Sequence, residues 1–453
     1  MDDACERRRE TGNERMTWWV TLLALFGALT ALLLTGMPIA FSFLGLNIAG
    51  AVLFFGGAEG IGQVVRNGVG AITNFSLTPI PFFILMGELL LHSGVAMKAI
   101  DAFDNVIGRV PGRLSVIAVT AGTVFSAISG STVATTALLG SLLLPQMLRR
   151  GYHPSLATGP IMAIGGVDAL IPPSAIAVLM ASLSGISISG LLIAGVIPGV
   201  LLASFFVVYI IVRVYMTPEL APAFEPQKLR GWMKWRPVLV NVTPLVAIFV
   251  LVVLAMSAGW ATPTESAALG ALATVGVCFA YRSLSWENLG VSLAGTASIS
   301  GMILFIMLGA TTFSQILVFT GATDGIVALV SDSQLAPWAV LATMLAILLV
   351  LGCFLDQIAI LLITLPFYMP LVQLLGFDPI WFGVLYLICM QLGLITPPFG
   401  MLLFTMRGVA PPEITTRQIY RAVVPYVCLG LLMLGLVAAF PALATWLPAA
   451  LKS

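Results

Sequence analysis

Long apolar segments limit what this chain can fold into more than any other feature of its sequence. Residues 17–36 (TWWVTLLALFGALTALLLTG) and 245–260 (LVAIFVLVVLAMSAGW) contain no charged residue. Both are close to the length of ~20 residues that a helix needs to cross a bilayer. Of the 453 residues, 59% are hydrophobic and only 9% are charged. This composition predicts an all-α polytopic membrane protein without a soluble domain.

Several kinds of site are not expected in this chain. Its five cysteines stand singly with no CxxC spacing, which argues against a disulfide framework or a zinc site. The sequence has no G-x-x-x-x-G-K-[ST] motif, so a nucleotide-driven reaction is not indicated. With a net charge of +1 we expect no nucleic acid partner, and we expect no catalytic residues and no cofactor. Residues 1–16 form a polar tail that we expect not to be native, with Met16 as the natural start.

The second half of the chain repeats the first at a spacing of 225 residues. At this spacing GYHP (151–154) matches GFDP (376–379), and IPPS (171–174) matches TPPF (396–399). Five prolines coincide, where roughly one would do so by chance. We therefore predict two repeats, 17–237 and 238–453.

Each repeat contains a pair of apolar segments that are too short to cross the membrane twice. In the first repeat the pair occupies 114–148 around SGST, and in the second it occupies 335–374 around LDQ. Such pairs are typical of re-entrant hairpins whose tips lie at mid-membrane. Each hairpin is followed by a helix that a Pro-Pro pair interrupts, at 155–183 and 380–409.

The distribution of lysine and arginine predicts that the two repeats have opposite topology. If 92–113 is cytoplasmic, fourteen basic residues lie inside, and only Arg66 and Lys452 lie outside apart from the N-terminal tail. The fourteen are Lys98, Arg109, Arg113, Arg149, Arg150, Arg213, Lys228, Arg230, Lys234, Arg236, Arg282, Arg407, Arg417 and Arg421. The second hairpin has acidic flanks without Lys or Arg, which places it on the opposite side from the first.

Inverted repeats with re-entrant tips and broken helices are typical of secondary transporters that bind near the midplane. Because proline has no N–H, a break at Pro172 and Pro173 leaves carbonyls that can bind a hard cation such as sodium. The tip SGS (129–131) adds hydroxyl groups, and GLITPPFG (393–400) with Asp356 offers the same groups in the second repeat. Two cation sites related by pseudo-symmetry are the natural interpretation.

Four motifs in this order resemble the large membrane subunit of tripartite ATP-independent periplasmic (TRAP) transporters. They are FSAISGSTVATTALLGSLLLPQMLRRGYHPSLATGP, LIPPSAI, TPTESAALGA and GLITPPFG. The resemblance extends from Met16 to the C-terminus. It implies an elevator-type, sodium-coupled importer of an organic acid anion in the bacterial inner membrane. It also implies two partners, a small four-helix membrane subunit and a periplasmic substrate-binding protein.

The resemblance further implies which residues hold the sodium ions and the substrate. Sodium site one would consist of Ser129, Gly130, Ser131, Asp168 and Pro172, and sodium site two of Gly352, Asp356, Gly393, Thr396 and Pro397. Substrate would lie between the tips, with Ser131, Ser174 and Asp356 as the candidates to face it.

Two residues depart from the family pattern. Family members usually carry glycine where this chain has Asp168, and many carry glutamate where it has Gln391. An aspartate at the centre of a membrane helix costs ~2.5 to 3.5 kcal/mol, so it needs a partner, a cation or a proton. Our hypothesis is that Asp168 tunes the first cation site or adds proton sensitivity.

Three other functions remain open at this stage. A stand-alone ion-coupled carboxylate symporter or anion pump of similar fold would work without a binding protein. An intramembrane hydrolase using Ser129 or Ser131 would need a base at membrane depth, but His92 and His153 lie at segment ends. The paired hairpins disfavour a passive channel.

Overall fold

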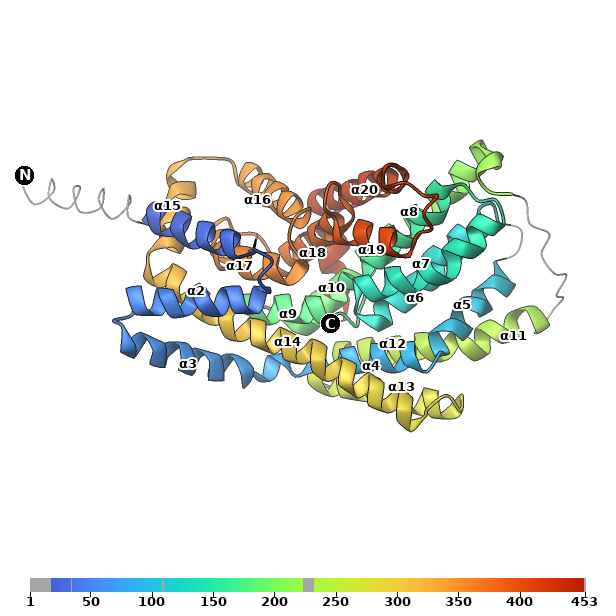
Figure 1. Ribbon diagram of the computed structural model, residues 1–453, viewed down its shortest axis with the longest axis horizontal. Coiled ribbons are helices and arrows are strands. Elements are labelled where there is room, and N and C mark those ends of the chain that lie inside the picture. The colour runs from blue at the N-terminus through green and yellow to red at the C-terminus, as the bar shows by residue number, and fades with distance from the viewer. Residues whose placement is uncertain (1–17, 34, 108–109, 223–231, 452–453) are drawn as a thin grey trace, which may run out of the picture. The chain divides into compact units, whose positions relative to one another are not determined.

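The computed structural model describes residues 18–33, 35–107, 110–222 and 232–451, and the polar tail 1–16 lies outside these residues. Throughout the described part the regular structure is helical, as the composition predicts (Figure 1). The N-terminal helix spans Trp18–Leu33. It is followed by α2 (Ile39–Phe54), α3 (Ala58–Ile72), η1 (Phe75–Leu77), α4 (Pro79–His92), α5 (Val95–Val106), α6 (Arg113–Ser129), α7 (Thr132–Arg149), α8 (Pro154–Gly165), η2 (Val167–Ala169), α9 (Ala175–Ser184), α10 (Ile188–Met216) and η3 (Pro218–Leu220). The remaining helices are α11 (Trp232–Asn241), α12 (Thr243–Ser257), α13 (Pro263–Ala280), α14 (Trp286–Phe319), α15 (Ala322–Asp332), α16 (Pro337–Gly352), α17 (Gln357–Leu374), α18 (Pro379–Ile395), α19 (Met401–Val409), α20 (Thr416–Ala439) and α21 (Ala442–Ala450).

The described helices include six that are long and apolar enough to cross a membrane, or seven if the bent pair α11–α12 counts as one span. The longest are α10, with 29 residues, and α14, with 34. Since helix formation satisfies the backbone within each segment, these helices can lie in lipid. The helices agree with the predicted polytopic membrane protein.

Helices occupy the four segments that the sequence predicts as re-entrant hairpins and broken helices, while the re-entrant placement of the hairpins stays a prediction. In the first half α6 and α7 occupy the segment 114–148, and α8 and α9 the segment 155–183. In the second half α16 and α17 occupy 335–374, and α18 and α19 occupy 380–409. Both bounds of α17 lie 225 residues after those of α7, so these helices follow the repeat spacing of the sequence. The opposite topology of the two halves stays a prediction.

The chain divides into two compact units. Unit 1 comprises the described parts of residues 1–77, 298–344 and 361–378, and unit 2 comprises 78–297, 345–360 and 379–453. Both predicted cation sites therefore fall in unit 2.

Polar and aromatic contacts join α2 to α14 within unit 1. The Asn47 side-chain amide donates to the buried carbonyl of Gly309, at 2.5 Å. One turn away, the rings of Phe43 and Phe313 meet edge to face with centroids 5.1 Å apart. A buried hydrogen bond and ring packing thus fix this helix pair.

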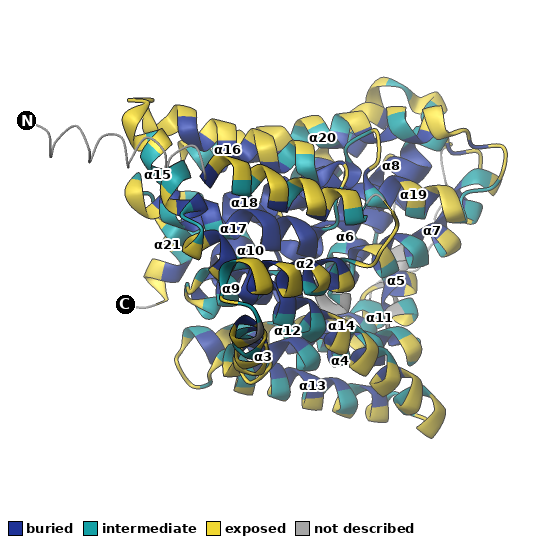
Figure 2. Ribbon diagram, turned by 60° about the vertical axis from the view of Figure 1, so that its left-hand side comes forward, coloured by how far each residue is buried: buried dark blue, intermediate teal, exposed yellow. Residues whose placement is uncertain are grey.

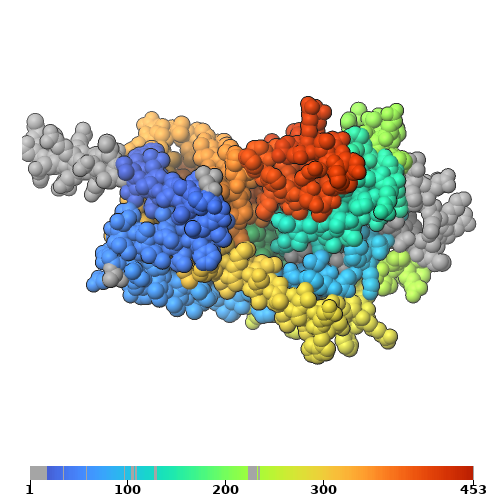
Figure 3. Space-filling view, in the orientation of Figure 1, coloured from blue at the N-terminus to red at the C-terminus, as the bar shows by residue number. Residues whose placement is uncertain are grey.

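Helices α6, α7, α8, α18 and α20 form the centre of unit 2. Here α8 packs against α6, α7 and α20, and α18 packs against α20. Every residue of α18 from Trp381 to Ile395 is buried (Figure 2). Figure 3 shows the red α19–α20 region directly against the teal α7–α8 region, in agreement with the contacts of α19 with α7 and of α20 with α8. The predicted hairpin one and broken helix one thus share one core with the second half's last helices.

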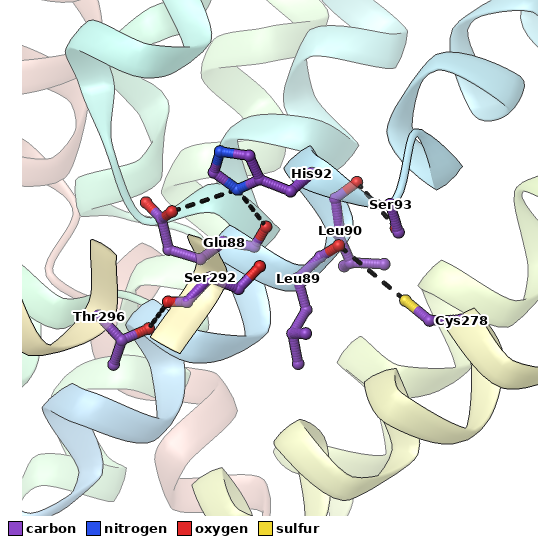
Figure 4. Close-up of polar contacts among 8 residues, drawn as sticks. All are labelled: Glu88, Leu89, Leu90, His92, Ser93, Cys278, Ser292 and Thr296. Atoms are coloured by element: carbon purple, nitrogen blue, oxygen red, sulfur yellow. Dashed lines mark hydrogen bonds and ion pairs between the residues drawn. The ribbon is translucent and has the colours of Figure 1, made fainter. Parts of the chain in front are cut away.

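A polar cluster also lies in unit 2, where α4 meets the first turns of α14 (Figure 4). The Glu88 carboxylate lies 3.4 Å from Nδ1 of His92, and a Cβ added at Gly295 would be 2.5 Å from the Glu88 Oε2 atom. The Thr296 hydroxyl donates to the Ser292 carbonyl at 2.8 Å. Glycine at 295 thus leaves space for a carboxylate against the helix backbone.

Because α8 packs so closely against α20, one methyl group added between them should lower the stability of the protein strongly. A Cβ at Gly159 would lie 2.6 Å from the Ala422 carbonyl oxygen and 2.7 Å from the Tyr426 ring. We expect Gly159→Ala to lower the free energy of unfolding by about 1–3 kcal/mol, because neither neighbour can move away freely. The midpoint of thermal unfolding in detergent measures this.

Gly435→Ala is the matched control, because Gly435 also lies in a helix of unit 2 but faces open space. Its midpoint should stay unchanged or rise, since alanine favours a helix by up to about 1 kcal/mol over glycine. Equal midpoints for the two variants would contradict the packing of α8 on α20.

Candidate cation and substrate site

The first hairpin tip is a tight turn between two helices. Helix α6 ends at Ser129, and Gly130 follows with a φ of 58°, a left-handed conformation that glycine adopts without strain. Ser131 then caps α7, because its hydroxyl accepts the backbone N–H of Ala134 at 3.3 Å. The SGS motif therefore ends one helix and begins the next.

The first broken helix is interrupted by a short 3-10 turn and the proline pair. Helix α8 ends at Gly165, η2 follows, and the Pro172–Pro173 peptide bond is cis. Ser174 begins α9, and its hydroxyl accepts from the Ala177 N–H at 3.2 Å and donates to the Ala169 carbonyl at 3.3 Å. Ser174 is 2% exposed, so this predicted substrate residue is buried and holds the two sides of the break together.

Both helices of hairpin one contact the end of α8. The Ser126 hydroxyl of α6 donates to the Gly165 carbonyl at 3.4 Å. On the other side, a Cβ at Gly165 would collide with the Thr136 hydroxyl of α7. The hairpin and the break are thus packed together, and part of the expected supply of free carbonyls is already used: Gly165 and Ala169 each accept from a serine.

Asp168 lies in η2 and is 3% exposed. Among the described residues its buried Oδ1 atom has no hydrogen-bond partner. No ion pair in the described part of the chain includes Asp168. A buried carboxylate oxygen without a protein partner is suited to bind a cation or a proton.

Two other unpartnered oxygen atoms lie on the helices that surround this segment. They are Oγ1 of Thr136 on α7 and Oε1 of Gln391 on α18, and both side chains are buried. A Cβ at Gly166 would lie 2.7 Å from Cγ of Gln391, and η2 packs against both α6 and α18. Residues 165 and 166 are therefore packed against Thr136 of the first half and Gln391 of the second half of the sequence.

The second tip and the second break meet through two glycines. A Cβ at Gly393 would lie 2.5 Å from Cα of Gly352, so the end of α16 contacts the backbone of α18 directly. Asp356 follows at the tip, where its Oδ2 accepts from the Ile358 N–H at 3.1 Å and its buried Oδ1 has no partner. The structure thus brings together Gly352 and Gly393 of the predicted site two.

Thr396 and Pro397 stand at the second break itself. The Thr396 hydroxyl donates to the Leu392 carbonyl at 2.6 Å, and the Pro397–Pro398 peptide bond is cis, as in the first break. The hydroxyl oxygen keeps a free lone pair, because here it acts as a donor. The tip and the break thus offer the carboxylate oxygen of Asp356 and the hydroxyl oxygen of Thr396 as hard ligands.

Sequence reasoning did not place three residues of this region in the sites: Ser126, Thr136 and Gln391, of which only Gln391 was singled out, as a departure from the expected pattern. Ser126 stands one turn before the predicted tip, so its spacing could have indicated a cap for the broken helix. Thr136 and Gln391 face residues 165 and 166 only because α7 and α18 pack against the same helix end. No local pattern in the sequence reveals that contact.

Comparison with known proteins identifies relatives over almost the whole chain. Residues 26–443 match the family described as "Tripartite ATP-independent periplasmic transporter, DctM component". The C4-dicarboxylate TRAP transporter large permease protein DctM of Rhodobacter capsulatus is 32% identical over 446 residues, covering 95% of this chain and 99% of that protein. The sialic acid TRAP transporter large permease protein SiaM of Vibrio cholerae is 30% identical, covering 94% of this chain and 97% of its own length.

Solved structures share the fold at lower sequence identity. The crystal structure of the YdaH transporter of Alcanivorax borkumensis superposes with a TM-score of 0.59, covering 87% of this chain and 90% of that one. The two sequences are 15% identical, so this similarity concerns the fold alone.

The glycine contact at the second tip predicts a local effect on backbone opening. We expect Gly393→Ala to push α18 away from Gly352, because backbone atoms on both sides cannot rotate out of the way. Hydrogen exchange of the amides at 350–357 should become about tenfold faster, as expected for a local destabilisation of ~1.4 kcal/mol. Mass spectrometry of peptides from the exchanged protein measures this.

Gly408→Ala is the control, because a Cβ at Gly408 in α19 meets no atom within 4 Å. Its exchange at 350–357 should match that of the unaltered protein. Unchanged exchange in Gly393→Ala would show that the two glycines are not in contact.

Proposed function

This chain belongs to the DctM family of tripartite ATP-independent periplasmic transporters and is a large permease subunit, and we propose that it couples sodium entry to uptake of an organic acid anion. A dicarboxylate, a sugar acid or a similar anion is the proposed substrate class. The named relatives transport C4-dicarboxylates and sialic acid, which are both carboxylic acids. The observation that carries the proposal is the pairing of each hairpin with a broken helix, with unpartnered carboxylate oxygens at both places.

The proposed sodium sites use oxygen atoms only, as a hard cation prefers. Site one takes its ligands from the tip at 129–131, from Asp168 and from backbone carbonyls before Pro172. Site two takes them from Asp356, Thr396 and the backbone near Gly352, Gly393 and Pro397. Each sodium ion that crosses ~100 mV releases ~2.3 kcal/mol, so two ions can drive strong accumulation of an anion.

The substrate is proposed to bind between the two hairpin tips, near Ser131 and Asp356. Sodium at the tips would offset the negative charge of the substrate in the apolar interior, and the need for both ions would link their transport. Ser174 would contribute by holding the first break, since its hydroxyl is already bonded to α9 and to Ala169. The hairpins and broken helices are proposed to move together as an elevator.

The proposed partners are a small four-helix membrane subunit and a periplasmic substrate-binding protein, in the bacterial inner membrane. The binding protein would select and deliver the anion, while this subunit supplies the path and the coupling ions. The basic residues predicted on the cytoplasmic side would orient the chain so that Arg66 lies toward the periplasm.

A second candidate function is a stand-alone symporter or anion pump. The observation that favours it is the fold shared with the YdaH transporter, at a TM-score of 0.59. This candidate would transport without a binding protein, whereas the DctM family is named for a tripartite system.

Uptake by reconstituted vesicles separates the two candidates. We expect vesicles that contain this chain and its small membrane subunit to accumulate an organic acid only when the matching binding protein and a sodium gradient are both present. Radiolabelled C4-dicarboxylates and sugar acids are the substrates to screen. Accumulation at full rate without the binding protein would instead establish the stand-alone symporter.

Asp168→Asn tests the contribution of the carboxylate to sodium site one. The amide has the same shape but no charge, so we expect the sodium concentration for half-maximal uptake to rise about tenfold, equivalent to ~1.4 kcal/mol. The same variant should lose sodium-induced thermal stabilisation. Asp168→Gly, which restores the residue usual in the family, should also change the sodium and pH dependence of uptake.

The matched control is Asp324→Asn, because Asp324 is an exposed acidic residue of unit 1. It should leave the sodium dependence unchanged. If Asp168→Asn and Asp168→Gly both keep the sodium dependence and the pH profile of the unaltered protein, Asp168 has no part in cation coupling.

A further inference from the structure

Unit 1 contains a crevice that the proposed transport function does not use. It has a volume of about 650 Å³ and lies among α2, α3 and the last turn and a half of α14. Glu59, Gln63 and Arg66 of α3 supply its polar wall, and Phe54, Phe55 and Phe319 supply aromatic surface. The rings of Phe55 and Phe319 meet edge to face with centroids 5.1 Å apart. The crevice thus combines opposite charges with an apolar wall.

Glu59 and Arg66 lie on the same face of α3, seven residues and therefore about two helical turns apart. Helical side chains lean toward the N-terminus, which directs the arginine toward the glutamate. The Arg66 guanidinium donates from Nε and Nη2 to the Gln63 Oε1 atom, at 3.2 and 2.8 Å. Neither charged residue has an ion-pair partner among the residues that the structure describes. Each charge is available to a ligand in the crevice.

A chain of side-chain hydrogen bonds fixes this polar wall. The Gln63 amide donates to the Asn67 Oδ1 atom at 2.8 Å, and the Asn67 amide donates to the Gln315 Oε1 atom at 2.6 Å. Arg66 is thereby connected through two amides to α14. Because its partners are held in place, the guanidinium loses less conformational entropy when it binds an anion.

A second face of α3, well separated from the polar wall around the helix, is apolar and exposed. Ile61, Val65, Val69 and Ile72 follow each other at helical spacing and are between 44% and 61% exposed. Such a helix, apolar on one face and charged on the other, is typical of helices that lie in the membrane interface. The predicted topology places Arg66 on the periplasmic side, so the crevice would open at the outer leaflet.

We propose that this crevice binds the headgroup of a zwitterionic phospholipid that carries a primary ammonium, such as phosphatidylethanolamine. Arg66 binds the phosphate, Glu59 binds the ammonium, and the acyl chains lie against the aromatic wall of the crevice. The match rests on charge: a simple anion would satisfy only Arg66 and would be repelled by Glu59. A headgroup with both charges satisfies each residue.

Lipid is favoured over a protein occupant because the helix that supplies the polar wall also carries a separate exposed apolar face, formed by Ile61, Val65, Val69 and Ile72. A protein partner that paired with Glu59 and Arg66 would compete with the membrane lipids around α3. Both residues are exposed, so their substitution should not disturb the fold of unit 1.

The test uses the large and small subunits purified together in nanodiscs of defined composition, with retained lipid measured by native mass spectrometry. In discs of equal phosphatidylethanolamine and phosphatidylglycerol, we expect an enrichment of about threefold for phosphatidylethanolamine, as one partly exposed ion pair provides. Glu59→Gln should reduce this ratio to about one, since it removes only the partner of the ammonium. Arg66→Gln should reduce the retention of both lipids.

Glu413→Gln and Arg417→Gln are the matched controls, because both residues are exposed, belong to unit 2 and do not line the crevice. They should keep the enrichment. Equal retention of the two lipids by the unaltered protein would overturn the proposal, as would a ratio that survives Glu59→Gln. If the crevice variants lose the small subunit or the binding protein while their lipid ratio is unchanged, the crevice is a protein-docking surface and the proposal is wrong.

Discussion

The fold of unit 2 depends on how backbone groups at interrupted helix ends find partners in an apolar interior. Water cannot supply those partners, so each end must be closed by protein or by a bound ion. In the first half, serine hydroxyls close the ends: Ser126 bonds Gly165, Ser131 caps α7, and Ser174 joins α9 to Ala169. In the second half, Thr396 bonds Leu392. The small polar residues around each break therefore already have a structural role, because their hydroxyl groups bond the helix ends. Any role as ligands comes in addition to that.

Glycines then decide how closely these ends approach. Gly352 lies against Gly393, and Gly165 lies against Thr136, at distances that exclude a methyl group. Because glycine has no side chain, the backbones approach closely and the polar atoms of one helix lie directly beside those of the other. A cation can use such atoms only where some remain unpartnered after the helix ends are closed. Oδ1 of Asp168 and Oδ1 of Asp356 meet this condition.

The positions of these elements could be predicted because proline and spacing carry most of the information. Proline has no N–H, so each Pro-Pro pair marks a break, and the 225-residue repeat locates the second set from the first. The contacts of the neighbouring residues 165 and 166 could not be predicted. Thr136 and Gln391 approach residues 165 and 166 from helices far apart in the chain, and only packing brings them together. Fewer free carbonyls remain than expected, because the hydroxyls of Ser126, Ser174 and Thr396 already donate to Gly165, Ala169 and Leu392.

Asp168 is important because helices from both halves of the sequence pack around the segment that contains it. Its segment is held between α6 and α7 of the first half and α18 of the second, and the glycines at 165 and 166 leave no space for side chains. An ionised carboxylate there needs a positive charge, and no basic side chain in the described residues pairs with it. Under the proposed function, a cation at Asp168 would neutralise that charge while hairpin one and α18 are packed around the break. Its release would leave a buried charge unpaired, which disfavours the same packing. Under that proposal, the position of the carboxylate would let a bound cation influence the arrangement of hairpin one and the broken helix directly, which a glycine at 168 could not provide.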